Sequence, residues 1–245
     1  MGTVKLGGLS LPFPIQLPYL VPGKCNTYLN CIRSTTQSTP VKSALSVDEI
    51  PPNAMRQASE PRWSSAGFSL GVDLGLSRTG LAISKGFAFR PLMVLELRGQ
   101  KLEDRLVHIA QKQEVDEFIV GLPLSSDGKE TPQSNKVRSI AGWKIEVLPY
   151  MNGGERKSVG GWRVYLQDEY GTSTEAMNHM VTMGLNRSTR KGKLDAYAAV
   201  MLLERYFSMA GDGVELVVPK QSELQIKLRK ASSMRTDIFQ DGFQS

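Results

Sequence analysis

Acidic residues occur at three widely separated places in this chain where burial would be costly. Asp73 lies inside the apolar stretch SLGVDLG, the pair Asp168-Glu169 ends WRVYLQDE, and Asp195 lies near the start of the apolar run KLDAYAAVMLL. A buried carboxylate is unfavourable unless it is paired or binds a cation. Taken by itself, Asp195 has a structural explanation, because an acid in the first turn of a helix is favoured by the helix dipole. Asp73 has the weakest structural explanation of the three.

Carboxylates brought together repel one another unless a divalent cation neutralises them. Ligands that are all oxygen favour Mg²⁺ or Mn²⁺ over zinc. Such a site suits phosphodiester hydrolysis, in which two metals about 4 Å apart activate water and stabilise the leaving oxygen. This hypothesis requires that the fold gathers the three acids and that none of them is neutralised by an arginine of its own.

Few other residues could act as catalytic groups. The chain has only two histidines, His108 and His179, which excludes a three-histidine zinc site. Both fall on the polar faces of expected helices, so a histidine-based triad is poorly supported. Both cysteines, Cys25 and Cys31, lie near the N-terminus, which excludes a cysteine nucleophile or a cysteine zinc site in the body of the chain. The metal hypothesis needs no side-chain base, so it is compatible with this composition.

Basic residues crowd before the third acid in NRSTRKGKLD, which we interpret as a loop. A charge run of this kind is either a solvated loop or, beside a metal site, a contact for the phosphate backbone of a nucleic acid. Arg78, in the turn after Asp73, is a weaker candidate of the same kind. The substrate-binding candidates in this run are Arg187, Arg190, Lys191 and Lys193.

Hydrophobic periodicity predicts the elements that would position these residues. FSLGVDLG, TGLAIS and PLMVLELR read as an antiparallel meander, and VDEFIVGLPL and WRVYLQDE read as two later strands, with VELVVP as a short last candidate. Helices are expected in KLEDRLVHIAQKQ and KLDAYAAVMLLERYF. A third helix is expected to begin after Thr131, with Pro132 at its first position. A fourth is expected to begin at a capping box of Thr172 and Glu175 and to end at Gly184. The order predicts an α/β fold, a mixed sheet with helices on both faces.

The ends of the chain differ from this body. The first 47 residues carry four basic and no acidic residues, so only +2 of the net charge of +6 remains for the rest. A Ser/Thr-rich, weakly basic leader without acids is typical of an organelle transit peptide, and a disordered tail is the alternative. We assign residues 1–60 to this leader, 66–218 to the domain and 219–245 to a mobile tail. No apolar stretch reaches the roughly 20 residues of a membrane span.

Four segments also resemble, in order, the motifs of the YqgF family: LGVDLGLSRTGLAIS, FIVGLPLSSDGKETPQSNKVR, VYLQDEYGTSTEA and KLDAYAAVMLLERY. The family resembles Holliday junction resolvases and is associated with maturation of pre-16S ribosomal RNA. The resemblance implies an RNase H-like fold and a metal-dependent nuclease with Asp73, Glu169 and Asp195 as its metal-binding and catalytic acids. It also places Gly75 and Gly80 in a tight turn beside the first acid.

The resemblance has two departures. Tyr170 stands where the family's DER motif has arginine, and Thr172 in the same segment joins the substrate-binding candidates. The second departure is the segment 141–161, where Pro149 and the turn Asn152-Gly153-Gly154 interrupt a long helix that the family has.

Several functions remain open at this point. The first is an organellar nuclease that uses Mg²⁺ or Mn²⁺ and acts on structured RNA, in the chloroplast or alternatively the mitochondrion, with pre-ribosomal particles as partners. The second is a non-catalytic RNA-binding factor for ribosome assembly. A Holliday junction resolvase acting on branched DNA is a further alternative, because recognition by shape leaves no base-reading signature. An ATPase of the sugar-kinase type would need a second domain, for which the body is too short.

Overall fold

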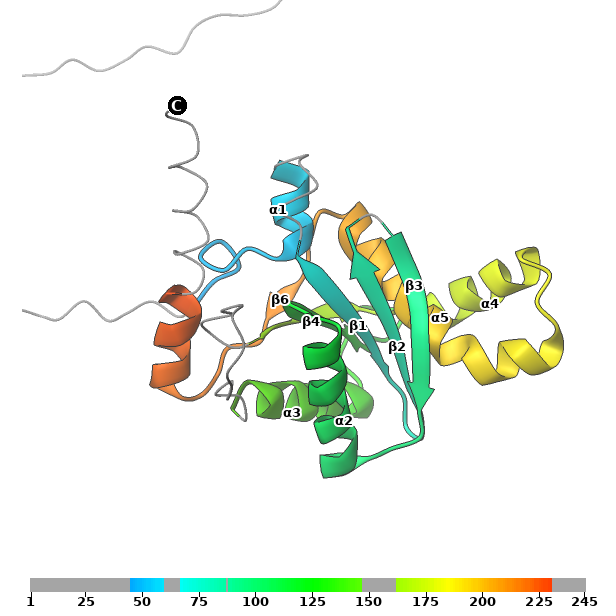
Figure 1. Ribbon diagram of the computed structural model, residues 1–245, viewed down its shortest axis with the longest axis horizontal. Helices are drawn as coiled ribbons and strands as arrows, with labels where there is room; N and C mark the ends of the chain where they lie inside the picture. Colours follow the sequence, from blue (N-terminus) through cyan, green and yellow to red (C-terminus); the bar gives the residue numbers. More distant parts are fainter. Residues whose placement is uncertain (1–44, 60–66, 87, 147–161, 231–245) are drawn as a thin grey trace, which may run out of the picture. The chain divides into compact units, whose positions relative to one another are not determined.

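The computed structural model of the protein describes residues 45–59, 67–86, 88–146 and 162–230, without the side chains of 143–146 (Figure 1). Its sheet has six strands in the order β3-β2-β1-β4-β5-β6. The strands are β1 (Phe68–Leu74), β2 (Thr79–Lys85), β3 (Ala88–Leu95), β4 (Glu117–Leu122), β5 (Arg163–Asp168) and β6 (Glu215–Leu216). The first three pair antiparallel as expected, while β1, β4 and β5 run parallel. The predicted mixed sheet, a meander continued by parallel strands, is confirmed.

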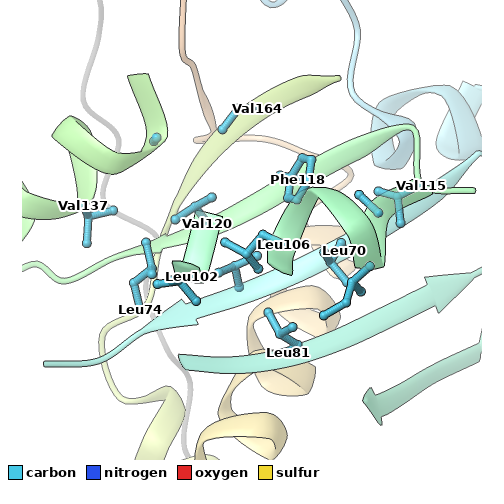
Figure 2. Packing of buried hydrophobic residues seen from close by; sticks show 14 of the residues in the cluster. Leu70, Leu74, Leu81, Leu102, Leu106, Val115, Phe118, Val120, Val137 and Val164 are labelled. Carbon is cyan, nitrogen blue, oxygen red and sulfur yellow. The ribbon is translucent and has the colours of Figure 1, made fainter. Parts of the chain in front are cut away.

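The helices pack on both faces of this sheet. They are α1 (Asn53–Ser59), α2 (Gly99–Lys112), α3 (Pro132–Glu146), α4 (Thr172–Thr182) and α5 (Arg187–Ser208), and residues 222–230 form one more. Figure 2 shows the apolar cluster on the face of α2 and α3, where Leu70, Leu74 and Val120 of the sheet meet Leu106 and Val137. The second cluster joins Ala82, Ile119 and Tyr165 of the opposite face to α5. Because neighbouring residues of a strand point to opposite faces, Leu70, Val72 and Leu74 leave Gly71 and Asp73 facing α5.

Two helix predictions are corrected by the structure. The predicted loop NRSTRKGKLD is instead the start of α5, whose first turn is capped by the Asn186 side chain accepting a hydrogen bond from the Thr189 amide at 2.8 Å. Asp195 therefore lies well inside the helix rather than in its first turn. The predicted capping box is also wrong, because Gly171, with a φ of 81°, precedes the helix, and Thr172 is its first residue. The turn at Gly184 ends α4 as expected.

The atypical segment 141–161 is described only in part. Helix α3 begins at Pro132, as predicted, and continues to Glu146, so the first residues of the segment are helical. Val137 and Ala141 are buried against the sheet. Pro149 and the Asn152-Gly153-Gly154 turn lie outside the described residues.

The folded domain begins earlier and ends later than the sequence indicates. Leu45, Ile50 and Ala54 are buried in the cluster beneath α5, although residues 1–60 were assigned to a leader. Leu228 joins the same cluster from the helix at 222–230, a segment expected to be a mobile tail. Arg229 and Glu49 form an ion pair at 3.2 Å, so the two extensions also contact each other.

A buried charged group holds the first extension to the sheet. Glu117 is fully buried at the start of β4. Its carboxylate accepts hydrogen bonds from the hydroxyls of Ser69 and Tyr206 at 2.7 Å and from the backbone N–H of Asn53 at 3.0 Å. Arg163 lies 3.4 Å from the same carboxylate and donates to Asn53 at 2.7 Å. The charge of Glu117 is thus balanced inside the core, and the segment 51–54 supplies part of that balance.

Replacing Arg163 is expected to be strongly destabilising. Arg163→Met keeps an apolar stem but leaves the Glu117 carboxylate buried without its counter-charge, which costs about 3–5 kcal/mol. The matched control is Arg138→Met, because Arg138 pairs with Glu130 and Glu215 at 2.6 Å on the surface. Each exposed pair contributes about 1 kcal/mol or less, so the loss of both is expected to cost about 2 kcal/mol at most. Urea unfolding of the two variants checks the difference, and equal losses would contradict a buried ion pair at Arg163.

Within the described residues, no helix is long and apolar enough to cross a membrane.

Candidate active site

The first acid is positioned by the close packing of α5 on the sheet. Asp73 pairs with Gly80 across the β1–β2 ladder. A Cβ atom at Gly80 would lie 1.9 Å from the Asp195 backbone carbonyl oxygen. Only glycine therefore allows the Asp195 segment of α5 to approach the strand beside Asp73. The resemblance placed Gly80 in a tight turn, but its structural role is this helix contact, whereas Gly75 does lie in the turn, against the Arg78 carbonyl.

Glu169 reaches the same region from the end of β5. Glu169 follows the last residue of β5, and its carboxylate lies over Gly121 of β4, where a Cβ atom would come within 1.9 Å of Oε2. Gly121 follows Val120, the parallel-strand partner of Val72, so it lies at the level of Asp73. A second glycine thus makes room for the Glu169 side chain to extend across β4 toward β1.

The electrostatics show that Asp73 interacts with both other acids. Burial, followed by the negative charge of Asp195, raises the pKa of Asp73 to about 7. Burial, followed by the charges of Asp73 and Asp168, raises the pKa of Glu169 to about 8. Elevated pKa values with these two causes are typical of functional carboxylates and also of acids that await a cation.

The donor chemistry fits a divalent metal ion. Glu169 Oε2 and Asp195 Oδ2 are buried and accept no hydrogen bond. Unsatisfied carboxylate oxygens are ligands that Mg²⁺ and Mn²⁺ prefer. The geometry is not that of a closed metal cage, because no group of three acidic, histidine or cysteine side chains in the described ranges is arranged to hold a metal. The acids are gathered around Asp73 without a common centre.

Asp195 is paired with an arginine, so the condition that no acid of the site has an arginine of its own is not met in this structure. Arg78 Nε lies 2.9 Å from Asp195 Oδ2, close enough for an ion pair although the N–H direction does not make a hydrogen bond. Arg78 also donates to the Lys191 carbonyl at 3.3 Å. The pair is partly open to solvent, with 32% of the Arg78 side chain and 23% of the Asp195 side chain exposed. Such exposed pairs contribute about 1 kcal/mol or less, so a cation or a phosphate can separate them.

The other substrate-binding candidates fall into two groups. Arg187, Lys191 and Lys193 are exposed on the first turns of α5, which begin beside α4 (Figure 1). Arg190 instead donates to the Leu185 carbonyl at 3.0 Å. Thr172 is buried, and its hydroxyl donates to the Glu169 carbonyl at 2.9 Å, so it orients the segment that carries Glu169 rather than facing substrate.

Tyr170, which replaces the family's arginine, is 56% exposed beside Glu169. Its backbone carbonyl and that of Asp168 accept hydrogen bonds from Arg205 of α5, at 2.9 and 3.1 Å. A guanidinium from another element therefore supports the segment that carries Glu169. His108 and His179 are both exposed, as predicted.

The contact at Gly80 is expected to be intolerant of any side chain. In Gly80→Ala the new methyl group would collide with the backbone of α5, so the helix must shift away from Asp73, at a cost of about 1–3 kcal/mol. Gly192→Ala is the control, since Gly192 is helical with open space around it and alanine favours helix by up to about 1 kcal/mol. Thermal unfolding of both variants is the measurement. A Gly80→Ala protein as stable as the wild type would refute the close approach.

The fold and the acids define a class of protein: an α/β domain with a six-stranded mixed sheet and a carboxylate site where β1, β5 and α5 meet. The family model described as "RuvX: Holliday junction resolvase" matches residues 67–209. The chain belongs to this family, which confirms the YqgF resemblance. The extensions at 45–59 and 222–230 lie outside the matched range.

Curated relatives carry the name "Putative pre-16S rRNA nuclease". The protein of Shewanella oneidensis is 26% identical over 56% of this chain and 92% of its own length, and that of Chlorobium phaeobacteroides is 30% identical over 58% and 93%. One from Escherichia coli O157:H7 is 31% identical over 58% and 96%. Among solved structures, Thermus thermophilus RuvC in complex with a Holliday junction substrate has a TM-score of 0.36 and 13% identity, over 61% of this chain and 99% of that chain.

Proposed function

We propose that the protein is a metal-dependent endonuclease that matures pre-16S ribosomal RNA in an organelle. The observation that carries the proposal is the convergence of Asp73 with Glu169 and Asp195, in which the buried Glu169 Oε2 accepts no hydrogen bond and Asp195 Oδ2 is held only by the ion pair with Arg78. The substrate comes from the names of the relatives, which match over most of their own length. The plastid location rests on the leader composition alone.

Each acid has a defined part in this proposal. Asp73, Glu169 and Asp195 would hold Mg²⁺ or Mn²⁺, with Asp195 released from Arg78. The bound ion would supply an activated water and polarise the phosphoryl oxygens. Arg78, once free, lies beside the site with a guanidinium suited to a phosphate oxygen.

The exposed bases of α5 would hold the nucleic acid. Arg187, Lys191 and Lys193 lie on the same helix as Asp195 and make no ion pair within the described parts of the chain. Contacts of this type fix the register of the backbone over the acids without reading sequence. Binding is therefore expected to weaken with increasing salt.

The test is cleavage of precursor 16S RNA by the purified full chain, with a four-way DNA junction in parallel. Cleavage of the RNA in Mg²⁺ or Mn²⁺, abolished by EDTA, is the expected result. Preferential cleavage of the junction would replace the RNA substrate with branched DNA. No metal-dependent cleavage of either substrate would contradict the nuclease.

One observation favours a second function, a non-catalytic RNA-binding assembly factor. Arg78 neutralises Asp195 in this structure, as it would if the acids served only the fold. The two functions are separated by whether Mn²⁺ displaces Arg78 from Asp195, because a structural ion pair would persist in the presence of the metal.

A further inference from the structure

Tyr170 is an exposed aromatic residue on a segment whose backbone is held on both sides. Its N–H donates a hydrogen bond to Asp168 Oδ1 at 2.9 Å, and its carbonyl accepts one from Arg205 at 2.9 Å. The carbonyl of the preceding residue, Glu169, accepts a hydrogen bond from the Thr172 hydroxyl at 2.9 Å. The peptide groups around Tyr170 are therefore fixed, although 56% of the residue is exposed.

The side chain of Tyr170 has no part in holding this segment. Within the parts of the chain that the structure describes, its ring contacts no other aromatic ring and no cation, and its hydroxyl makes no hydrogen bond. The hydrogen bonds that fix the segment come from main-chain atoms of Tyr170. Single exposed aromatic residues are common on protein surfaces, so the position of this one beside an acid of the site is the informative observation.

Tyr170 lies on the other side of the acids from the basic residues of α5. The exposed basic residues of α5 fall within 187–193, before Asp195. Arg205, which donates to the Tyr170 carbonyl, follows Asp195 on the same helix. A helix rises 1.5 Å per residue, so Lys193 and Arg205 are about 18 Å apart along α5. A short single strand that runs from the basic residues across the acids would reach the ring of Tyr170.

We propose that Tyr170 stacks on an unpaired base of the substrate, next to the phosphate held at the acids. The bases of single strands bind on aromatic faces while their phosphates meet cations. A ring whose backbone is already fixed loses little conformational freedom when a base stacks on it. The inference rests on the proposed nuclease function for the identity of the substrate. It adds a preference for a single-stranded segment beside the point of cleavage.

The experiment measures binding without cleavage, in EDTA, by fluorescence anisotropy of a labelled single-stranded RNA. Tyr170→Ala is expected to weaken binding about tenfold, because the stacking surface is lost. Tyr170→Phe keeps the ring and is expected to bind within twofold of the wild type. The control is Ile226→Ala, which truncates another exposed side chain, on the helix at 222–230, and is expected to change binding less than twofold. Circular dichroism checks that each variant is folded.

Two further ligands show whether a base is stacked. The fluorescence of 2-aminopurine, placed in turn at each position of the strand, is expected to be quenched at one position by the wild type and by Tyr170→Phe, but not by Tyr170→Ala. A fully paired RNA duplex is expected to bind the wild type and Tyr170→Ala equally.

The inference is overturned if Tyr170→Phe weakens binding as much as Tyr170→Ala, if the duplex shows the same loss, or if no position is quenched. Because no cleavage is measured, these outcomes are distinct from failure of the nuclease proposal, which the cleavage of precursor RNA decides.

Discussion

Asp73→Asn is expected to lower phosphodiester cleavage by on the order of a thousandfold while RNA binding is retained. The amide has the same shape but no charge, and Asp73 is the acid that interacts with both Asp195 and Glu169. Metal-ion stabilisation of a transition state is worth several kcal/mol, and about 1.4 kcal/mol is a factor of ten in rate. Binding depends on the basic residues of α5, which the substitution does not touch.

The matched control is Glu204→Gln, which removes one negative charge from an exposed position on α5, away from the acids. It is expected to cleave at the wild-type rate. Single-turnover cleavage and anisotropy on the same preparations separate chemistry from binding. Wild-type activity in Asp73→Asn, in protein free of contaminating nuclease, would eliminate the proposed mechanism.

The same substitution is expected to stabilise the metal-free protein at alkaline pH. The pKa of Asp73 is raised to about 7, so the folded state holds this proton more tightly than the unfolded state does. Ionisation then opposes folding, and the penalty grows as the pH rises from near 4 to about 7 and stays constant above that. Asp73→Asn removes the penalty. Because the group is partly solvated, we expect a gain of about 1–3 kcal/mol at pH 8.5 and much less at pH 4.5.

Thermal unfolding in EDTA at the two pH values measures this gain. About 1 kcal/mol corresponds to about 2–4 °C for a domain of this size. Saturating Mn²⁺ is expected to raise the midpoint of the wild type, since a ligand that binds only the folded state stabilises it by mass action. It is expected to do little for Asp73→Asn. A variant less stable than the wild type at pH 8.5 would show that Asp73 is a structural acid with a partner.

The periodic elements could be predicted from the sequence, and the non-periodic ones could not. Alternation in SLGVDLG correctly separated Leu70 and Val72 from Asp73, because adjacent side chains of a strand face opposite ways. The segment at 45–59 contributes isolated buried residues such as Leu45 and Ile50, without a repeat that marks them. Its burial depends on hydrogen bonds to Arg163 and Tyr165, which only the fold brings near.

The candidate site was predictable in its acids but not in what surrounds them. The segment NRSTRKGK is polar and contains Gly192, so it lacks the apolar periodicity that indicates a helix. The start of α5 was therefore predicted too late, and Asp195 was placed too near a helix terminus. The roles of Gly80 and Gly121 follow from backbone and side-chain approach across the sheet, which no local pattern reports. The Arg78–Asp195 pair likewise joins segments far apart in the sequence.

The most direct measurement is a crystal structure of the protein with Mn²⁺, located by its anomalous scattering. The account predicts manganese bound by carboxylate oxygens of Asp73, Glu169 and Asp195, with Arg78 moved away from Asp195. Crystals in saturating Mn²⁺ that show no metal at these acids, and Arg78 still on Asp195, would contradict it.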